Sequence, residues 1–160
     1  MAAAEADMFR SCKSFAYGLL VLFCLSLPAL AGAQPQSAAM MSPFMENVVA
    51  AEVEKRAEVF RELLSQYYRL IPQDEVEAAE ARADKADCAG TEACMAEVRR
   101  ILGVDVVYNL RIEDQGYVDP VHLTRLGDNG VVKQYTQCNR CTRRLYRRTL
   151  EELLQVALAK

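Results

Sequence analysis

Four cysteines in the second half of the chain are the side chains with the clearest capacity for chemistry. They are Cys88, Cys94, Cys138 and Cys141. The last two form a Cys-x-x-Cys motif, "CNRC", which is typical of a redox centre, half of a zinc site or a short structural disulfide. These three interpretations imply different kinds of protein, and the surrounding residues decide between them.

A redox centre is the first interpretation of Cys138 and Cys141. A dithiol catalyst places a cysteine at a helix N-terminus, where the dipole and nearby cations lower the pKa of the thiol. Arg140, Arg143 and Arg144 would supply such cations. Thioredoxin-like proteins, however, carry the motif close to a βαβ unit, and here it lies near the end of the chain. Thiol-disulfide chemistry is therefore the alternative hypothesis and not the leading one.

A zinc site is the second interpretation. Four thiolates are enough to close a structural zinc site, and the C-x5-C pair together with the C-x2-C pair would provide them. In an exported chain such thiols are oxidised to disulfides. Metal binding by Cys88, Cys94, Cys138 and Cys141 therefore belongs to the same alternative hypothesis, and we expect no metal and no other cofactor.

Short disulfides are the third interpretation, and the spacing favours them. The ends of a β-turn lie within about 7 Å of each other, and a disulfide requires about 4.4–6.8 Å between the two Cα atoms. Cys138 can thus bond to Cys141 within one turn, and Cys88 can bond to Cys94 across a loop that contains Gly90. Local pairing is the preferred prediction, but four cysteines permit three connectivities, and cross-pairing stays open.

Five arginines follow or interrupt the second cysteine pair, and we call them the arginine cluster. They are Arg140, Arg143, Arg144, Arg147 and Arg148. Such a cluster can contact anionic lipid head groups, an acidic protein or a cell-wall polymer. The alternative is a solvated surface whose charges form ion pairs within the chain.

The single histidine, His122, has no serine or aspartate at a spacing typical of a catalytic site. Together with the arginine cluster, this predicts a contact surface and not an enzyme.

The N-terminal segment has the pattern of an export signal. Arg10 and Lys13 precede an apolar run over 15–30, and the small residues "AGA" end it at position 33. The run is about 16 residues, short of the roughly 20 that a transmembrane helix needs, although a retained anchor stays an alternative. We therefore predict a signal peptide over 1–33, a flexible leader over 34–39 and a single periplasmic domain over 40–160.

Hydrophobic periodicity predicts the elements of that domain. An amphipathic pattern predicts a helix with Asn47 as its N-cap and with charges, Arg56 among them, on its solvated face. The segment "YRLIP" (68–72) is a strand candidate. Residues 73–87 suggest a short exposed helix with Asp74 near its start, and residues 88–103 a helix capped by Thr91 and ended by Gly103. The segment 40–45 could form a short edge strand.

The rest of the chain reads as a meander followed by a helix. Alternation predicts a half-buried strand over 104–116 and two further strands over 117–126 and 131–137. Pro120 is expected at an edge or bulge, and Asn129–Gly130 in a hairpin. The last helix begins at Thr142 or at Thr149, where Glu152 would complete a capping box. The order predicts an α+β fold, an α/β sandwich of helices packed on a mixed sheet that ends in an antiparallel meander.

The segments "CAGTEACMAEVRRILGVDVVYNLRI" and "LTRLGDNGVV" resemble a pattern in exported bacterial proteins. In that pattern a cysteine-flanked helix leads into a strand, a turn and another strand, as in the N-terminal domain of TolB and the related CsgG-like periplasmic domains. The resemblance implies a small α/β domain of the cell envelope that works by contact with proteins, outer-membrane and cell-wall-associated proteins included. Tyr108-Asn109 stands where the pattern usually has a glycine-containing turn, so no binding residue is transferred.

Net charge and export together limit the other partners. The formal net charge is −3 over 160 residues, which does not indicate a nucleic-acid-binding protein, and an exported chain would not meet nucleic acid. Peripheral contact with a membrane surface remains compatible with the arginine cluster. The leading hypothesis is thus a non-enzymatic periplasmic interaction module, a component or adaptor of an envelope assembly.

Overall fold

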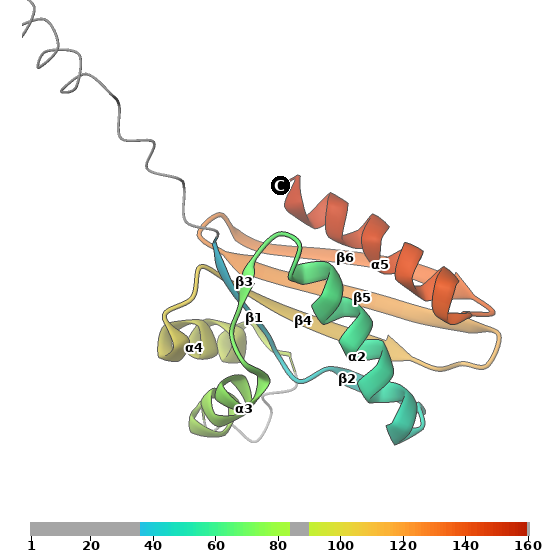
Figure 1. Ribbon diagram of the computed structural model, residues 1–160, viewed down its shortest axis with the longest axis horizontal. Helices are drawn as coiled ribbons and strands as arrows, with labels where there is room; N and C mark the ends of the chain where they lie inside the picture. Colours follow the sequence, from blue (N-terminus) through green and yellow to red (C-terminus); the bar gives the residue numbers. More distant parts are fainter. Residues whose placement is uncertain (1–35, 84–89, 160) are drawn as a thin grey trace, which may run out of the picture. The chain divides into compact units, whose positions relative to one another are not determined.

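A mixed sheet with helices on both faces organises the protein (Figure 1). The computed structural model describes residues 36–83 and 90–159, so the predicted signal peptide and Cys88 lie outside the described residues. The strands are β1 (Ser37–Met40), β2 (Phe44–Glu46), β3 (Arg69–Leu70), β4 (Val106–Glu113), β5 (Val118–Gly127) and β6 (Gly130–Asn139). The helices are α2 (Ala50–Leu64), α3 (Gln73–Arg82), α4 (Glu92–Leu102) and α5 (Arg143–Leu158).

The strand order is β3-β1-β4-β5-β6, with β2 pairing a further part of β4. The first strands are parallel, and β4, β5 and β6 form an antiparallel meander. The predicted α+β fold is confirmed. Among the described residues, no helix has the length and the apolar content needed to cross a membrane.

The prediction of a flexible leader over 34–39 was wrong for residues 37–39. These residues belong to β1, which lies between β3 and β4 and is buried along its whole length. Ala38 packs toward one helical layer and Ala39 toward the other. A central parallel strand is covered on both faces, and its small side chains removed the apolar bulk that would have identified it in the sequence.

The predicted edge strand over 40–45 is divided between two elements. Met40 ends β1 opposite Tyr108, and Phe44 begins β2 opposite Arg111, so both strands pair with successive parts of β4. Pro43 lies in the break between them, where the chain needs no backbone donor for the ladder.

Two helices cover each face of the sheet. Helices α2 and α5 pack on one face, where Phe60, Leu64 and Leu154 meet Tyr108 and Leu110 of β4. Helices α3 and α4 cover the other face, and their core residues Val76, Met95 and Val98 pack near Ala39 and Val107. Strand β4 is therefore buried from both sides over its first half, and the prediction of a half-buried strand holds only toward its end.

Capping chemistry decides three of the helix ends. Thr91 accepts a hydrogen bond from the backbone N–H of Cys94, and Gly103 ends α4 with a φ of 62°, as the sequence predicted. Asn47 was the wrong cap for α2, because the chain makes a left-handed step there (φ 59°) and the helix starts after Val49. Thr142 caps α5 by accepting from the N–H of Leu145, so the capping box predicted at Thr149 lies inside the helix and is wrong.

Strand β5 is an interior strand over most of its length, but its start at Pro120 is a local edge, as the sequence predicted. It pairs with β4 on one side and β6 on the other. The pairing with β4 stops at Val121, so Pro120 is beyond the reach of β4 and its missing N–H costs no bond there. Asp128 and Asn129 form the two-residue hairpin loop to β6, and Gly130, with a φ of 93°, pairs with Gly127.

Candidate functional site

The Cys-x-x-Cys motif is closed by a disulfide between Cys138 and Cys141, whose Cα atoms lie 5.4 Å apart. Cys138 is buried in β6 and Cys141 is half-buried just before α5. Cys94, in the first turn of α4, also belongs to a disulfide. Cys88, the partner that local pairing predicts for it, lies outside the described residues.

These bonds do not favour the alternative hypothesis of a metal site. A zinc site would need the thiolates of cysteines, and three of the four candidates are oxidised here. Within residues 36–83 and 90–159, no group of three or more histidine, cysteine or acidic side chains is arranged to hold a metal ion. The disulfide instead joins the end of β6 to the start of α5, and it thereby positions the arginine cluster.

Two members of the arginine cluster form ion pairs with glutamates. Arg147 binds Glu62 of α2 at 3.0 Å and Glu151 at 3.2 Å, and Arg148 binds Glu152 at 3.0 Å. The interpretation of solvated, internally paired charges therefore describes these two arginines.

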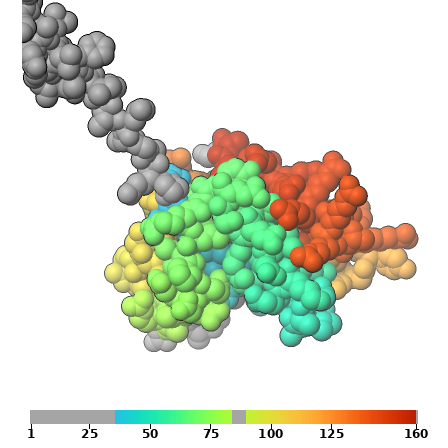
Figure 2. Space-filling view, viewed as in Figure 1, coloured from blue at the N-terminus to red at the C-terminus, as the bar shows by residue number. Residues whose placement is uncertain are grey.

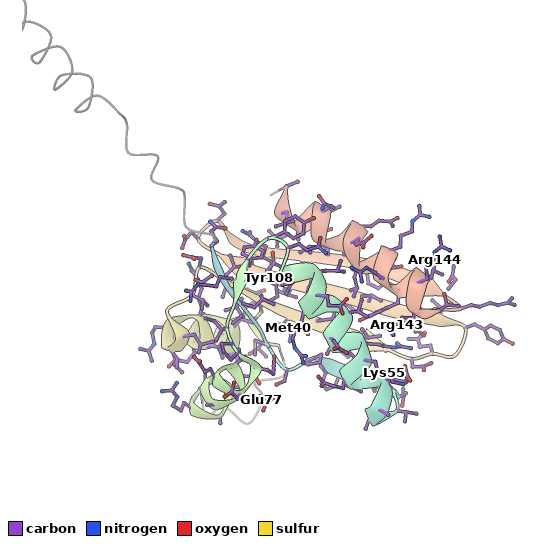
Figure 3. All side chains as sticks on the ribbon, viewed as in Figure 1. Met40, Lys55, Glu77, Tyr108, Arg143 and Arg144 are labelled. Carbon is purple, nitrogen blue, oxygen red and sulfur yellow. A yellow bond between two sulfur atoms is a disulfide. The ribbon has the colours of Figure 1, made fainter. Side chains whose placement is uncertain are left out.

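The other three arginines have no carboxylate within ion-pair distance in the described part of the chain. Arg140 has a left-handed backbone (φ 50°), and its guanidinium lies 5.6 Å from the ring centroid of Tyr117. Arg143 and Arg144 are exposed in the first turn of α5, which contains no acidic residue. In Figure 3, Arg143 lies on the side of α5 toward α2, and Arg144 lies on the opposite side.

These three arginines lie around the start of α5, where two large apolar side chains are also exposed. Tyr117 is 72% exposed and Leu145 is 40% exposed. Arginine and tyrosine are enriched among the residues that dominate binding energy at protein interfaces. We call Tyr117, Arg140, Arg143, Arg144 and Leu145 the α5-start surface.

A buried ion pair lies beneath this surface. Arg56 of α2 binds Asp119 of β5 at 3.1 Å, and their side chains are only 17% and 6% exposed. The Arg56 guanidinium also lies 5.5 Å from the ring centroid of Tyr146. Burial raises the pKa of Asp119, and the charge of Arg56 opposes that shift. In the sequence, Arg56 looked like one more charge on a solvated helix face, and no local signal marked Asp119 as its partner.

Tyr146 completes the arrangement. It is 3% exposed, and burial raises the pKa of its hydroxyl. That hydroxyl has no hydrogen-bond partner among the described residues. Arg56 therefore contacts both the ring of Tyr146 and the carboxylate of Asp119. Asp119 is the cross-strand neighbour of Cys138, so the disulfide, the ion pair and the start of α5 form one unit.

A cleft of about 80 Å³ opens between α2 and the start of α5. Figure 2 shows these helices next to each other on one face of the molecule. The cleft is lined by Glu52, Lys55, Arg56, Val59, Cys141, Arg143 and Tyr146. A hydrogen bond from Lys55 lowers the pKa of Glu52, and the charges of Lys55, Arg56 and Arg143 add to that effect.

His122, the single histidine, is placed away from this region on the opposite face of the sheet. Its ring packs against Tyr135 with centroids 4.7 Å apart. The described residues around the start of α5 therefore offer exposed positive charge and apolar contact area.

Comparisons with known proteins report on the fold. No family model matches the sequence, and no curated protein does. The C-terminal domain of LpoB from Salmonella enterica superposes with a TM-score of 0.52 at 12% identity, over 71% of this chain and 90% of that one. The Escherichia coli domain gives 0.52 at 11%, over 74% and 93%. Lipoprotein GNA1162 from Neisseria meningitidis gives 0.51 at 15%, over 77% and 97%.

At these identities the similarity concerns the fold alone. The finer resemblance to the N-terminal domain of TolB and to CsgG-like domains stays a hypothesis. The chain has the fold of the LpoB C-terminal domain and of lipoprotein GNA1162.

Proposed function

We propose that this protein is a non-enzymatic interaction module of the bacterial cell envelope, and that the α5-start surface contacts its protein partner. The fold shared with lipoprotein GNA1162 supports the location, because lipoproteins are held at membranes by their lipid. The predicted signal peptide supports it as well.

The observation that carries the proposal is the charge at the start of α5. A helix N-terminus has a partial positive charge and favours acidic residues. Here the first turn contains Arg143 and Arg144 and no acidic residue. Neither arginine has a carboxylate partner in the described residues, unlike Arg147 and Arg148, which lie about one turn later on the same helix. Local rules are broken most often where a function requires it, and an acidic partner would relieve this arrangement.

Site-specific photocrosslinking in living cells tests the proposal. A photoreactive amino acid replaces Arg144 in one version of the full chain and Glu77 in another. Glu77 is an exposed residue of α3, on the layer that covers the other face of the sheet (Figure 3). We expect discrete adducts with envelope proteins from position 144 and none from position 77.

A charge-matched comparison tests the role of the arginines themselves. Arg143→Gln/Arg144→Gln removes two charges that have no carboxylate partner among the described residues. Arg147→Gln/Arg148→Gln removes two charges that form ion pairs. The first double variant should lose copurifying envelope proteins, and the second should retain most of them. Equal losses, or adducts from position 77 alone, would contradict the proposed surface.

A further inference from the structure

The cleft between α2 and α5 has a more specific chemistry than the surface around it. Three cationic side chains, Lys55, Arg56 and Arg143, line it together with one carboxylate, Glu52. Asp119 neutralises Arg56 from below. The groups in and under the cleft therefore sum to three positive and two negative charges, which leaves one positive charge.

The cations differ in their freedom to bind a ligand. Arg56 is committed, because Asp119 holds its guanidinium and the Tyr146 ring lies against it. Lys55 is paired with Glu52 at 2.8 Å, but both side chains are half exposed or more, and such pairs exchange readily. Arg143 has no carboxylate partner among the described residues. Arg143 is thus the primary ligand-binding group, and Lys55 is the second.

The size and the lining of the cleft further restrict the class of ligand that it can bind. A volume of about 80 Å³ admits one small group, and Val59, Cys141 and the Tyr146 ring supply apolar walls. A single net positive charge matches a monoanion. A dianionic phosphate would leave an uncompensated charge beside Glu52. The planar fork of an arginine side chain, such as that of Arg143, suits a carboxylate, which it can bind through two parallel hydrogen bonds.

We propose that this cleft binds a carboxylate side chain, glutamate or aspartate, from an acidic segment of the partner protein. This inference rests on the proposed function and names the chemistry of the partner. The apolar walls contact the methylene groups of that side chain while Arg143 and Lys55 bind its carboxylate. Arg144 and Arg140, outside the cleft, contact further acidic residues of the same segment.

Binding of a labelled acidic peptide, acetyl-hexaglutamate amide, to the purified full-length protein provides the test, with acetyl-hexaglutamine amide as the neutral probe. Fluorescence anisotropy at low salt should show binding of the first and not of the second. Arg143→Gln should weaken hexaglutamate binding about tenfold, because it removes a charge-assisted contact. Lys55→Gln, on a different helix, should weaken it severalfold.

Arg148→Gln is the matched control, because it removes the same charge from the same helix outside the cleft. We expect less than about a twofold change, as for a distant surface charge. Equal effects of Arg143→Gln and Arg148→Gln, or no effect of Lys55→Gln, would indicate nonspecific electrostatic attraction of the peptide. Either result would refute the proposal that the cleft binds a carboxylate. Circular dichroism establishes that all three variants, at exposed positions, stay folded.

Vesicles containing phosphatidylglycerol distinguish a membrane from a protein ligand. Vesicle binding that depends on Arg143 and Lys55, without hexaglutamate binding, would overturn the proposal in favour of a lipid surface. Photocrosslinking from position 144 distinguishes a failure of the carboxylate cleft from a failure of the proposed function. If adducts persist in Arg143→Gln/Lys55→Gln, the interaction module stands and the carboxylate cleft does not. If position 144 also gives no adducts when Arg143 and Lys55 are intact, the proposed function itself is refuted.

Discussion

The buried pair Arg56–Asp119 offers a sharp test of how this domain is held together. Removing one partner of a buried ion pair typically costs about 3–5 kcal/mol, because the other charge stays buried alone. Arg56 is 17% exposed, so water offsets part of that cost, and we expect about 2–3 kcal/mol for Asp119→Asn at neutral pH. For a domain of this size the loss corresponds to a fall of roughly 10 °C in Tm.

Arg56→Met should show a different pH dependence from Asp119→Asn. Burial already raises the pKa of Asp119 and Arg56 opposes the rise, so removing Arg56 raises that pKa further. The folded state then binds a proton more readily than the unfolded state, and stability falls as pH rises above the ordinary aspartate value. The cost of Arg56→Met should therefore be smaller at about pH 4.5 than at about pH 7.5.

Chemical denaturation followed by far-UV circular dichroism measures these free energies, since the chain has no tryptophan. The double variant Arg56→Met/Asp119→Asn closes the cycle. It should lose less than the sum of the single losses by about 1–2 kcal/mol. Additive losses, or a cost of Arg56→Met that is the same at both pH values, would refute the reasoning.

Three further predictions concern the start of α5 and the end of α4, each read as a change in unfolding free energy. Thr142→Ala should cost about 1 kcal/mol because it removes the cap, while Thr149→Ala, inside the helix, should change stability by less than about 0.5 kcal/mol; the reverse order would place the helix start at Thr149. Cys138→Ala/Cys141→Ala should cost at least about 2 kcal/mol, the loop-closure entropy of four residues, and an unchanged denaturation midpoint would contradict it. Gly103→Ala should cost about 1 kcal/mol through its left-handed backbone alone, since no atom lies within 4 Å of the added Cβ; a stabilised variant would argue against that conformation.

Local patterns predicted much of the framework. Alternation identified the meander, and the cap at Thr91 and the stop at Gly103 defined α4. The three-residue cysteine spacing matched the Cys138–Cys141 bond. These predictions succeeded because periodicity, capping and turn closure depend on residues only a few positions apart.

The misreading of residues 37–39 has a physical cause. The small side chains at 37–39 looked like a flexible leader, but they suit a strand enclosed by helices on both faces. The deciding fact was which elements lie alongside, and that fact is not encoded within the segment. Pro120, by contrast, marked a local edge correctly, because the pairing of β5 with β4 ends before reaching it.

The sequence by itself predicted most of the elements, the Cys138–Cys141 bond and the existence of an arginine cluster. Only the tertiary structure decided which of those arginines are neutralised, because Glu62 reaches Arg147 across 85 positions of sequence. Likewise, Arg56 and Asp119 meet across 63 positions. Charge pairing depends on the packing of α2 against α5 and on strand register, and no local pattern carries that information. The start of α5 became a candidate contact surface for this reason.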